Sequence, residues 1–156
     1  MKPMSLESIL AAFDPIDREG VAPPDLRGTN WTEIDFLAWK GPHDPTKGYM
    51  VVDLPERPVG LLLRLHPSGR PGLCDLCHSI DRSSGASLAV VESWATPRMS
   101  CGIHICGDLD CSAAVRGLKC VYQLGETTPV GRRIERLQEH VERFARCATG
   151  LVTLTK

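Results

Sequence analysis

Apolar positions along the chain recur with two periods, and their order predicts helices at both ends of a small sheet. The first segment, residues 5–13, has the helical period and begins after Ser5, a suitable N-cap. Its apolar positions are Leu6, Ile9, Leu10 and Phe13. Residues 14–29 are rich in Pro, Gly, Asp and Arg, which favours an irregular connection.

The segment WTEIDFLAW, residues 31–39, carries much of the aromatic mass of the chain. It fits a short helix or turn capped by Thr32. Because tryptophan and phenylalanine bury large apolar areas, we expect these rings to fill the core.

Four strands are predicted in the middle of the chain. Residues 48–54 and 58–65 are rich in β-forming residues and flank a short turn, which predicts a hairpin. Residues 87–94 and 100–106 predict a second hairpin, so we expect four antiparallel strands. Gly60, inside the second run, indicates a bulge or a close backbone approach.

The helical period returns after the strands. Residues 108–119 predict a short helix with Asp108 as N-cap. A longer helix is expected from Thr128, as N-cap before Pro129, to a stop at Gly150. Its apolar stripe is one heptad seam wide and either packs on the sheet or pairs with a partner helix. The predicted fold class is α+β, a small antiparallel sheet with a C-terminal helix.

Composition places the chain among ordinary globular proteins of about one domain. It has 156 residues, 42% hydrophobic and 24% charged, with a net charge of -1. The longest apolar run, Val59–Leu63, is far shorter than a membrane span. The first 20 residues show no secretory signal, so we expect the reducing cytoplasm. Residues 130–156 are the basic end, with six bases against three acids.

Seven cysteines are the informative excess, and an odd number in a reducing compartment favours metal ligands over disulfides. Cys74 and Cys77 form a C-x2-C pair in a turn-rich stretch. Cys106 and Cys111 form a C-x4-C pair that ends in the first turn of a predicted helix. Zinc prefers four ligands in a tetrahedron, and the order knuckle, hairpin, helix is that of a treble-clef zinc finger. We therefore predict one structural Zn²⁺, since four thiolates leave no position for a reacting water.

The sequence allows other roles for the C-x-x-C pair and for the remaining thiols and histidines. A redox C-x-x-C would start a helix in a βαβ unit, and this one leads into a turn. His78 and His104 are reserve ligands, with His104 the better because it shares a strand face with Cys106. Cys120 and Cys147 are expected to be small buried hydrophobes.

Five segments together resemble one family. They are WTEIDFLAW, GYMVVDL, PVGLLLRL, LCDLCH and ICGDLDCSAAVRG. They are similar to the C-terminal treble-clef domain of elongation factor G-binding proteins, the FBP or FusB type, from about Trp31 to the last helix. The resemblance implies residues 1–30 as an N-terminal helix and irregular connection, and residues 31–156 as a single zinc-binding domain.

The resemblance also implies a function and two differences. Family members bind elongation factor G, and the resistance proteins among them help to free it from a stalled ribosome. Those proteins carry a helical domain before the zinc domain. In that position this chain has room for only one short helix. In some members a histidine fills the ligand position held here by Cys106, and both residue types bind zinc.

The leading hypothesis is a non-enzymatic cytoplasmic zinc protein that binds elongation factor G. The candidate contacts are solvent-facing groups expected near the zinc: Arg98, Met99, His104, Arg116 and Lys119. The alternative is a zinc module that binds ribosomal or other RNA through Arg116, Lys119 and the basic last helix. No common catalytic motif occurs, and Asp108 with Asp110 are better explained as helix-start charges than as an acid/base pair.

Overall fold

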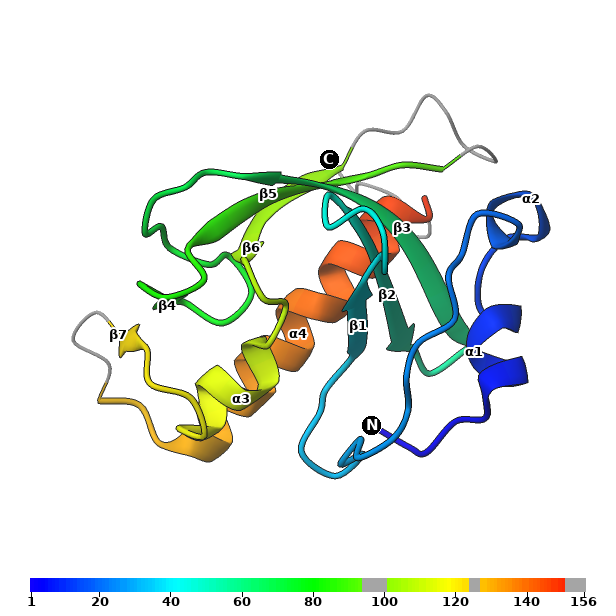
Figure 1. Ribbon diagram of the computed structural model, residues 1–156. Coiled ribbons are helices and arrows are strands. Elements are labelled where there is room, and N and C mark those ends of the chain that lie inside the picture. Colours follow the sequence, from blue (N-terminus) through cyan, green and yellow to red (C-terminus); the bar gives the residue numbers. More distant parts are fainter. Residues whose placement is uncertain (94–100, 124–126, 151–156) are drawn as a thin grey trace.

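A five-stranded antiparallel sheet forms the centre of the computed structural model, which describes residues 1–93, 101–123 and 127–150 (Figure 1). In spatial order its strands are β1 (Leu37–Lys40), β2 (Lys47–Asp53), β3 (Pro58–Pro67), β5 (Ala86–Val91) and β6 (Gly102–Cys106). A second, two-stranded sheet consists of β4 (Ser79–Ile80) and β7 (Tyr122–Gln123). The helices are α1 (Leu6–Ala11), α2 (Pro15–Arg18), α3 (Cys111–Arg116) and α4 (Val130–Ala148). The α+β class is confirmed.

Both predicted hairpins are present. Strands β2 and β3 pair antiparallel with Met50 opposite Leu61, and β5 pairs with β6 with Leu88 opposite His104. Strand β3 also pairs with β5, so the two hairpins join into one continuous sheet. Residues 94 and 100, at the inner ends of the second predicted hairpin, lie outside the described residues.

The helix alternative for residues 31–39 is wrong, because turns lead there into strand β1. Thr32 does not cap the turn. Its backbone N–H donates to the side chain of Asn30 at 3.3 Å. The strand places Trp39 opposite Tyr49 of β2, and their rings stack with centroids 5.3 Å apart. Cross-strand aromatic contact of this kind outweighs the marginal stability of a one-turn helix.

One face of the sheet packs against α4. The buried residues Leu137, Val141 and Phe144 of this helix belong to the same apolar core as Met50 and Leu61. The seam therefore packs on the sheet, as one of the two alternatives expected. The helix begins at Val130 with Pro129 as N-cap, one residue later than the sequence suggested.

The N-terminal segment packs on the opposite face. Ser5 caps α1 as predicted, since its Oγ accepts from the backbone N–H of Ser8 at 3.2 Å. The buried ring of Phe13 lies on Gly60, where a Cβ atom would stand 2.5 Å from the ring. The backbone N–H of Gly60 donates to the carbonyl of Ala12 at 2.8 Å, so the close backbone approach expected at Gly60 is confirmed. Residues expected to be irregular include α2, which has Pro15 at its first position and Asp14 as N-cap.

Candidate metal centre

The first cysteine pair lies in a tight turn before β4. The backbone N–H of His78 donates to the carbonyl of Cys74 at 2.9 Å, and that of Cys77 donates to Cys74 Sγ at 3.4 Å. Cys74 in turn donates its N–H to the carbonyl of Ser79 at 3.0 Å. His78 takes a left-handed conformation with φ 56°, which closes the turn. The turn holds both sulfurs on its inner side, as a zinc knuckle does.

The second pair joins the end of β6 to the start of α3. The N–H of Leu109, which has φ 64°, donates to the carbonyl of Cys106 at 2.9 Å. Gly107 lies so close to the chain at Ser84 that a Cβ atom would meet the Ser84 carbonyl oxygen at 2.2 Å. Cys111 is the first residue of α3, within the first helical turn as predicted.

The predicted helix start at Asp108 is wrong. Asp110 is the residue before α3, and Asp108 instead accepts the N–H of Asp110 at 3.0 Å. The chain needs residues 107–109 for the turn that aims Cys106 and Cys111 at one point, so the helix begins later.

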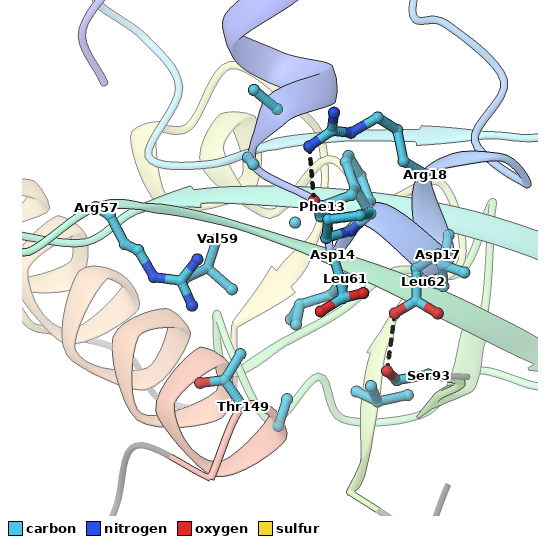
Figure 2. A pocket seen from close by; sticks show the side chains of 16 residues that line it. Phe13, Asp14, Asp17, Arg18, Arg57, Val59, Leu61, Leu62, Ser93 and Thr149 are labelled. Carbon is cyan, nitrogen blue, oxygen red and sulfur yellow. Dashed lines mark hydrogen bonds between the residues drawn. The ribbon is translucent and has the colours of Figure 1, made fainter. Parts of the chain in front are cut away.

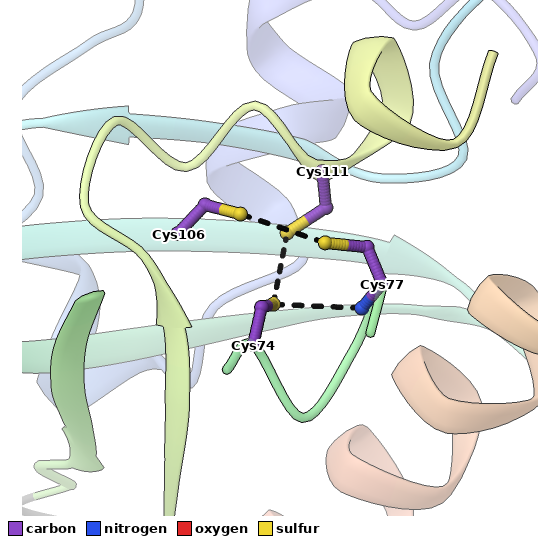
Figure 3. Close-up of side chains that lie close together, drawn as sticks. All are labelled: Cys74, Cys77, Cys106 and Cys111. Atoms are coloured by element: carbon purple, nitrogen blue, oxygen red, sulfur yellow. Dashed lines mark hydrogen bonds between the residues drawn. The ribbon is translucent and has the colours of Figure 1, made fainter. Parts of the chain in front are cut away.

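The four sulfurs converge on one point (Figure 3). Their Sγ atoms lie within 4.8 Å of one another, with Cys74 and Cys111 3.6 Å apart and Cys77 and Cys106 3.5 Å apart. A tetrahedral zinc with Zn–S bonds of about 2.3 Å requires sulfurs about 3.8 Å apart. All four residues are at most 2% exposed. The group is therefore suited to holding one zinc ion with its coordination sphere filled by sulfur.

The four cysteines shift one another's pKa values in opposite directions, which favours a bound cation. Hydrogen bonds from neighbouring thiols, that of Cys106 above all, hold the pKa of Cys77 far below its usual range. Hydrogen bonding to Cys106 and to the other two thiols, with complete burial, raises the pKa of Cys111 well above its usual range. One thiolate therefore forms at the expense of the next, and a divalent metal removes this competition because it stabilises all four charges.

A buried ion pair supports both turns. Asp81, 1% exposed, forms a salt bridge with Lys119, which also binds Asp108. Burial by itself would raise the pKa of Asp81, but Lys119 and hydrogen bonds from Ser84 and the backbone hold it below its usual range. Asp108 lies two residues after Cys106, and Asp81 directly follows β4, so Lys119 links the turn between Cys106 and Cys111 to the chain that follows the first cysteine pair. Sequence reasoning missed Asp81, although D-x-S-S before Gly85 is an Asx-turn signal.

Comparison with known proteins identifies the family. The profile of the FBP C-terminal treble-clef zinc-finger family matches residues 9–147. The chain belongs to this family. The match confirms the treble-clef zinc finger. Together with the buried group of four sulfurs, it supports a site for one zinc ion in this chain.

One similar solved structure is described as the structure of the fusidic acid resistance protein FusC. It shares 14% sequence identity at a TM-score of 0.60, which shows a common fold. The alignment covers 92% of this chain and 58% of that one, so this chain spans somewhat over half the length of FusC. No curated protein matched the sequence. Neither description names an enzyme class.

The candidate contact residues of this FBP zinc finger have different surroundings. Arg116 forms two hydrogen bonds with Asp35, at 2.5 and 3.1 Å, and Lys119 is held by its two carboxylates. His104 has a half-exposed side chain, and its backbone N–H donates to the carboxylate of Asp75 at 2.7 Å. Arg98 and Met99 lie outside the described residues.

Neither reserve ligand joins the sulfurs. In the described ranges, the group that could hold a metal consists of the four cysteines, without His78 or His104. The ring of His78 instead lies 4.9 Å from that of His140 on α4. The prediction that Cys120 and Cys147 are buried is wrong, since both are exposed. Cys120 follows the end of α3, and Cys147 lies in the last turn of α4.

A hollow of about 350 Å³ lies between α1, α2, β3 and the end of α4 (Figure 2). Several of its polar groups bind within the chain. Arg18 donates to the carbonyl of Phe13 at 3.4 Å, and Ser93 donates to Asp17 at 2.8 Å. The Arg18 contact stays within the N-terminal segment, and the Ser93 contact fastens that segment to the chain just after β5. Across the described ranges, no helix has both the length and the apolar character that a membrane crossing requires.

Proposed function

We propose that this FBP zinc finger is a non-enzymatic cytoplasmic protein that binds translation elongation factor G, with one structural zinc on Cys74, Cys77, Cys106 and Cys111. The observation that carries the proposal is the buried four-sulfur cluster within a chain of this family. A role like that of fusidic acid resistance proteins is its finer form, supported by the fold shared with FusC.

The proposed zinc role is structural because the site is closed. The four sulfurs satisfy the preferred coordination number of zinc, and none is more than 2% exposed. A catalytic zinc keeps one position open for water or substrate. Metal bound here would stabilise the turns and α3 and would act on a partner only through the surface that they support.

The proposed contact surface is the part of the sheet that the N-terminal segment leaves uncovered. Register places Leu88 of β5 between His66 of β3 and His104 of β6, so the three side chains share one face. Leu88 is 37% exposed and His104 is half-exposed. Arg98 and Met99, which are also proposed as contacts, belong in the sequence to the segment that joins β5 to β6. An apolar centre between polar groups is typical of a protein-binding surface.

Charge pairing favours a protein partner over RNA. Arg116 and Lys119 already have carboxylate partners, and on α4 Arg132 and Arg146 pair with glutamates. Binding phosphates would require these ion pairs to break, so we propose that Arg116 and Lys119 support the surface without touching the partner.

Calorimetric titration of the zinc-loaded chain into purified elongation factor G tests the proposal. We expect a Kd in the micromolar range or tighter, weakened about tenfold or more by Leu88→Asp and by His104→Ala. His43→Ala, a change in an exposed residue between β1 and β2, is the matched control and should leave the Kd unchanged. No micromolar binding would contradict the proposal, and binding to ribosomal RNA alone that weakens steeply with salt would favour the RNA alternative. Recycling of drug-stalled ribosomes by the chain would test the finer form.

A further inference from the structure

Two cysteines outside the metal centre meet across the molecule. Cys101 precedes β6, and Cys147 lies in the last turn of α4, 46 positions further along the chain. Their Sγ atoms are 3.1 Å apart. A disulfide bond has a sulfur–sulfur distance of about 2.05 Å, so a movement of about 1 Å separates this contact from a covalent bond.

We propose that Cys101 and Cys147 form a reversible dithiol–disulfide site that a low-molecular-weight disulfide such as oxidised glutathione can oxidise. Oxidation would bond the end of α4 to the edge strand β6 of the sheet. The site is independent of the zinc proposal, because it shares no residue with the four-sulfur cluster.

The surroundings of the two sulfurs fit this chemistry. Cys147 is exposed, whereas Cys101 is half-buried and packs against the apolar core. The carbonyl of Cys101 accepts the N–H of Val91 of β5 at 2.9 Å, which anchors its backbone to the sheet. Burial, with the neighbouring Cys147, raises the pKa of Cys101 to about 12. Cys147 is therefore the sulfur that meets the oxidant first.

The reaction is thiol–disulfide exchange in two steps. The Cys147 thiolate attacks one sulfur of the oxidant, forms a mixed disulfide and releases one small thiolate. The Cys101 thiol, which no longer faces a Cys147 thiolate, then loses its proton to solvent and attacks the Cys147 sulfur. This forms the intramolecular bond and releases the second small thiolate. The two cysteines lose two electrons and two protons, and one small disulfide becomes two thiols.

A metal bridge between these two sulfurs is less consistent with the geometry. Zinc-bound thiolates lie about 3.8 Å apart, and zinc requires four ligands. No described histidine, aspartate or glutamate completes a set with this pair. The distance of 3.1 Å between the Cys101 and Cys147 sulfurs fits a precursor of a disulfide bond better than a metal bridge.

Incubation of the zinc-loaded full chain with oxidised glutathione tests the proposal by intact-mass and peptide analysis. We expect the wild type to lose two hydrogens, keep its zinc and give a linked tryptic pair of residues 99–116 and 147–156. Cys101→Ser should instead accumulate glutathione on Cys147, because the resolving thiol is gone. Cys120→Ser, which removes an exposed cysteine outside the pair, should behave as the wild type.

Two outcomes would overturn the proposal. One is a wild type that accumulates the Cys147 mixed disulfide as stably as Cys101→Ser does. The other is oxidation that enters the zinc ligands and releases the metal while the Cys101–Cys147 linkage stays absent. The linkage should disappear when reduced glutathione is added in excess, since the site is proposed to be reversible.

Discussion

The five-stranded sheet and the zinc region, defined as residues 73–84 and 106–123, are stabilised by different physics. The sheet has strands of up to 10 residues, continuous ladders and apolar side chains on its α4 face. The zinc region has two-residue strands β4 and β7, the six-residue helix α3 and buried polar residues such as Asp81. Elements this short are unstable alone. The zinc region also buries Leu76, Leu109 and Val115 in the core that it shares with the sheet. The comparison teaches that sulfur–metal bonds and ion pairs add to apolar burial in the zinc region, because its short elements need more than the shared core.

Removing zinc should have the largest effect, because it should unfold the zinc region and leave the sheet folded. Structural zinc contributes about 10–16 kcal/mol in small zinc-finger peptides, which exceeds the stability of a typical domain. After chelation we expect hydrogen exchange to lose protection at Cys77, His78 and Leu109, while amides in β2 and β3 keep theirs. Added zinc should restore the protection. Equal loss in both regions would show that they do not differ in the way described.

The matching test on the sheet is Phe13→Ala, which removes the ring that covers Gly60. We expect the free energy of unfolding to fall by about 3–5 kcal/mol with the zinc content unchanged. Gly60→Ala should cost about 1–3 kcal/mol, because its Cβ would collide with the ring. In the Phe13→Ala background the same change should cost less, and urea denaturation of the four chains measures this coupling. Additive costs would contradict the close contact.

The ion pair of the zinc region is tested by Asp81→Asn. We expect a loss of about 2–3 kcal/mol, less than for a fully broken buried pair because Lys119 keeps Asp108. Asp81 has a lowered pKa in the folded chain, so its contribution is complete above the unfolded value of about 4 and disappears as pH falls below it. The difference in stability between the wild type and the variant should therefore shrink between about pH 5 and pH 2. A difference that grows in acid would contradict this assignment.

The smallest expected effect concerns the link between the two regions. Arg116 of α3 binds both oxygens of Asp35, which precedes β1. Arg116→Lys keeps the charge and loses the paired geometry, so we expect a cost of about 1–2 kcal/mol by thermal unfolding. Arg27→Lys, in an exposed pair with Asp25, is the control and should change stability by less than about 0.5 kcal/mol. Equal effects would show that the Arg116 link is no stronger than a surface pair.

Predictability from the sequence also differs between the two regions. The spacing of the cysteines predicted the cluster because ligand number and geometry are properties of zinc. Alternating and helical periods predicted both hairpins and α4, since each buries one face. Strand β1 was missed because its stability comes from Trp39 meeting Tyr49, a contact between distant segments.

The partners of charged and thiol groups were equally hidden. Lys119 and Arg116 look like solvent-facing groups in the sequence, and only the fold brings Asp81 and Asp35 to them. The contact of Cys101 with Cys147 depends on where α4 ends over the sheet. Pairings of this kind depend on tertiary structure, which local patterns do not contain.

Zinc stoichiometry by native mass spectrometry tests the central claim most directly. The wild type should carry one zinc per chain, and Cys74→Ser and Cys111→Ser should lose it. Cys101→Ser, Cys120→Ser and Cys147→Ser should retain it. A wild type without zinc, or a chain that keeps zinc in Cys111→Ser and loses it in Cys120→Ser, would contradict the four-sulfur site.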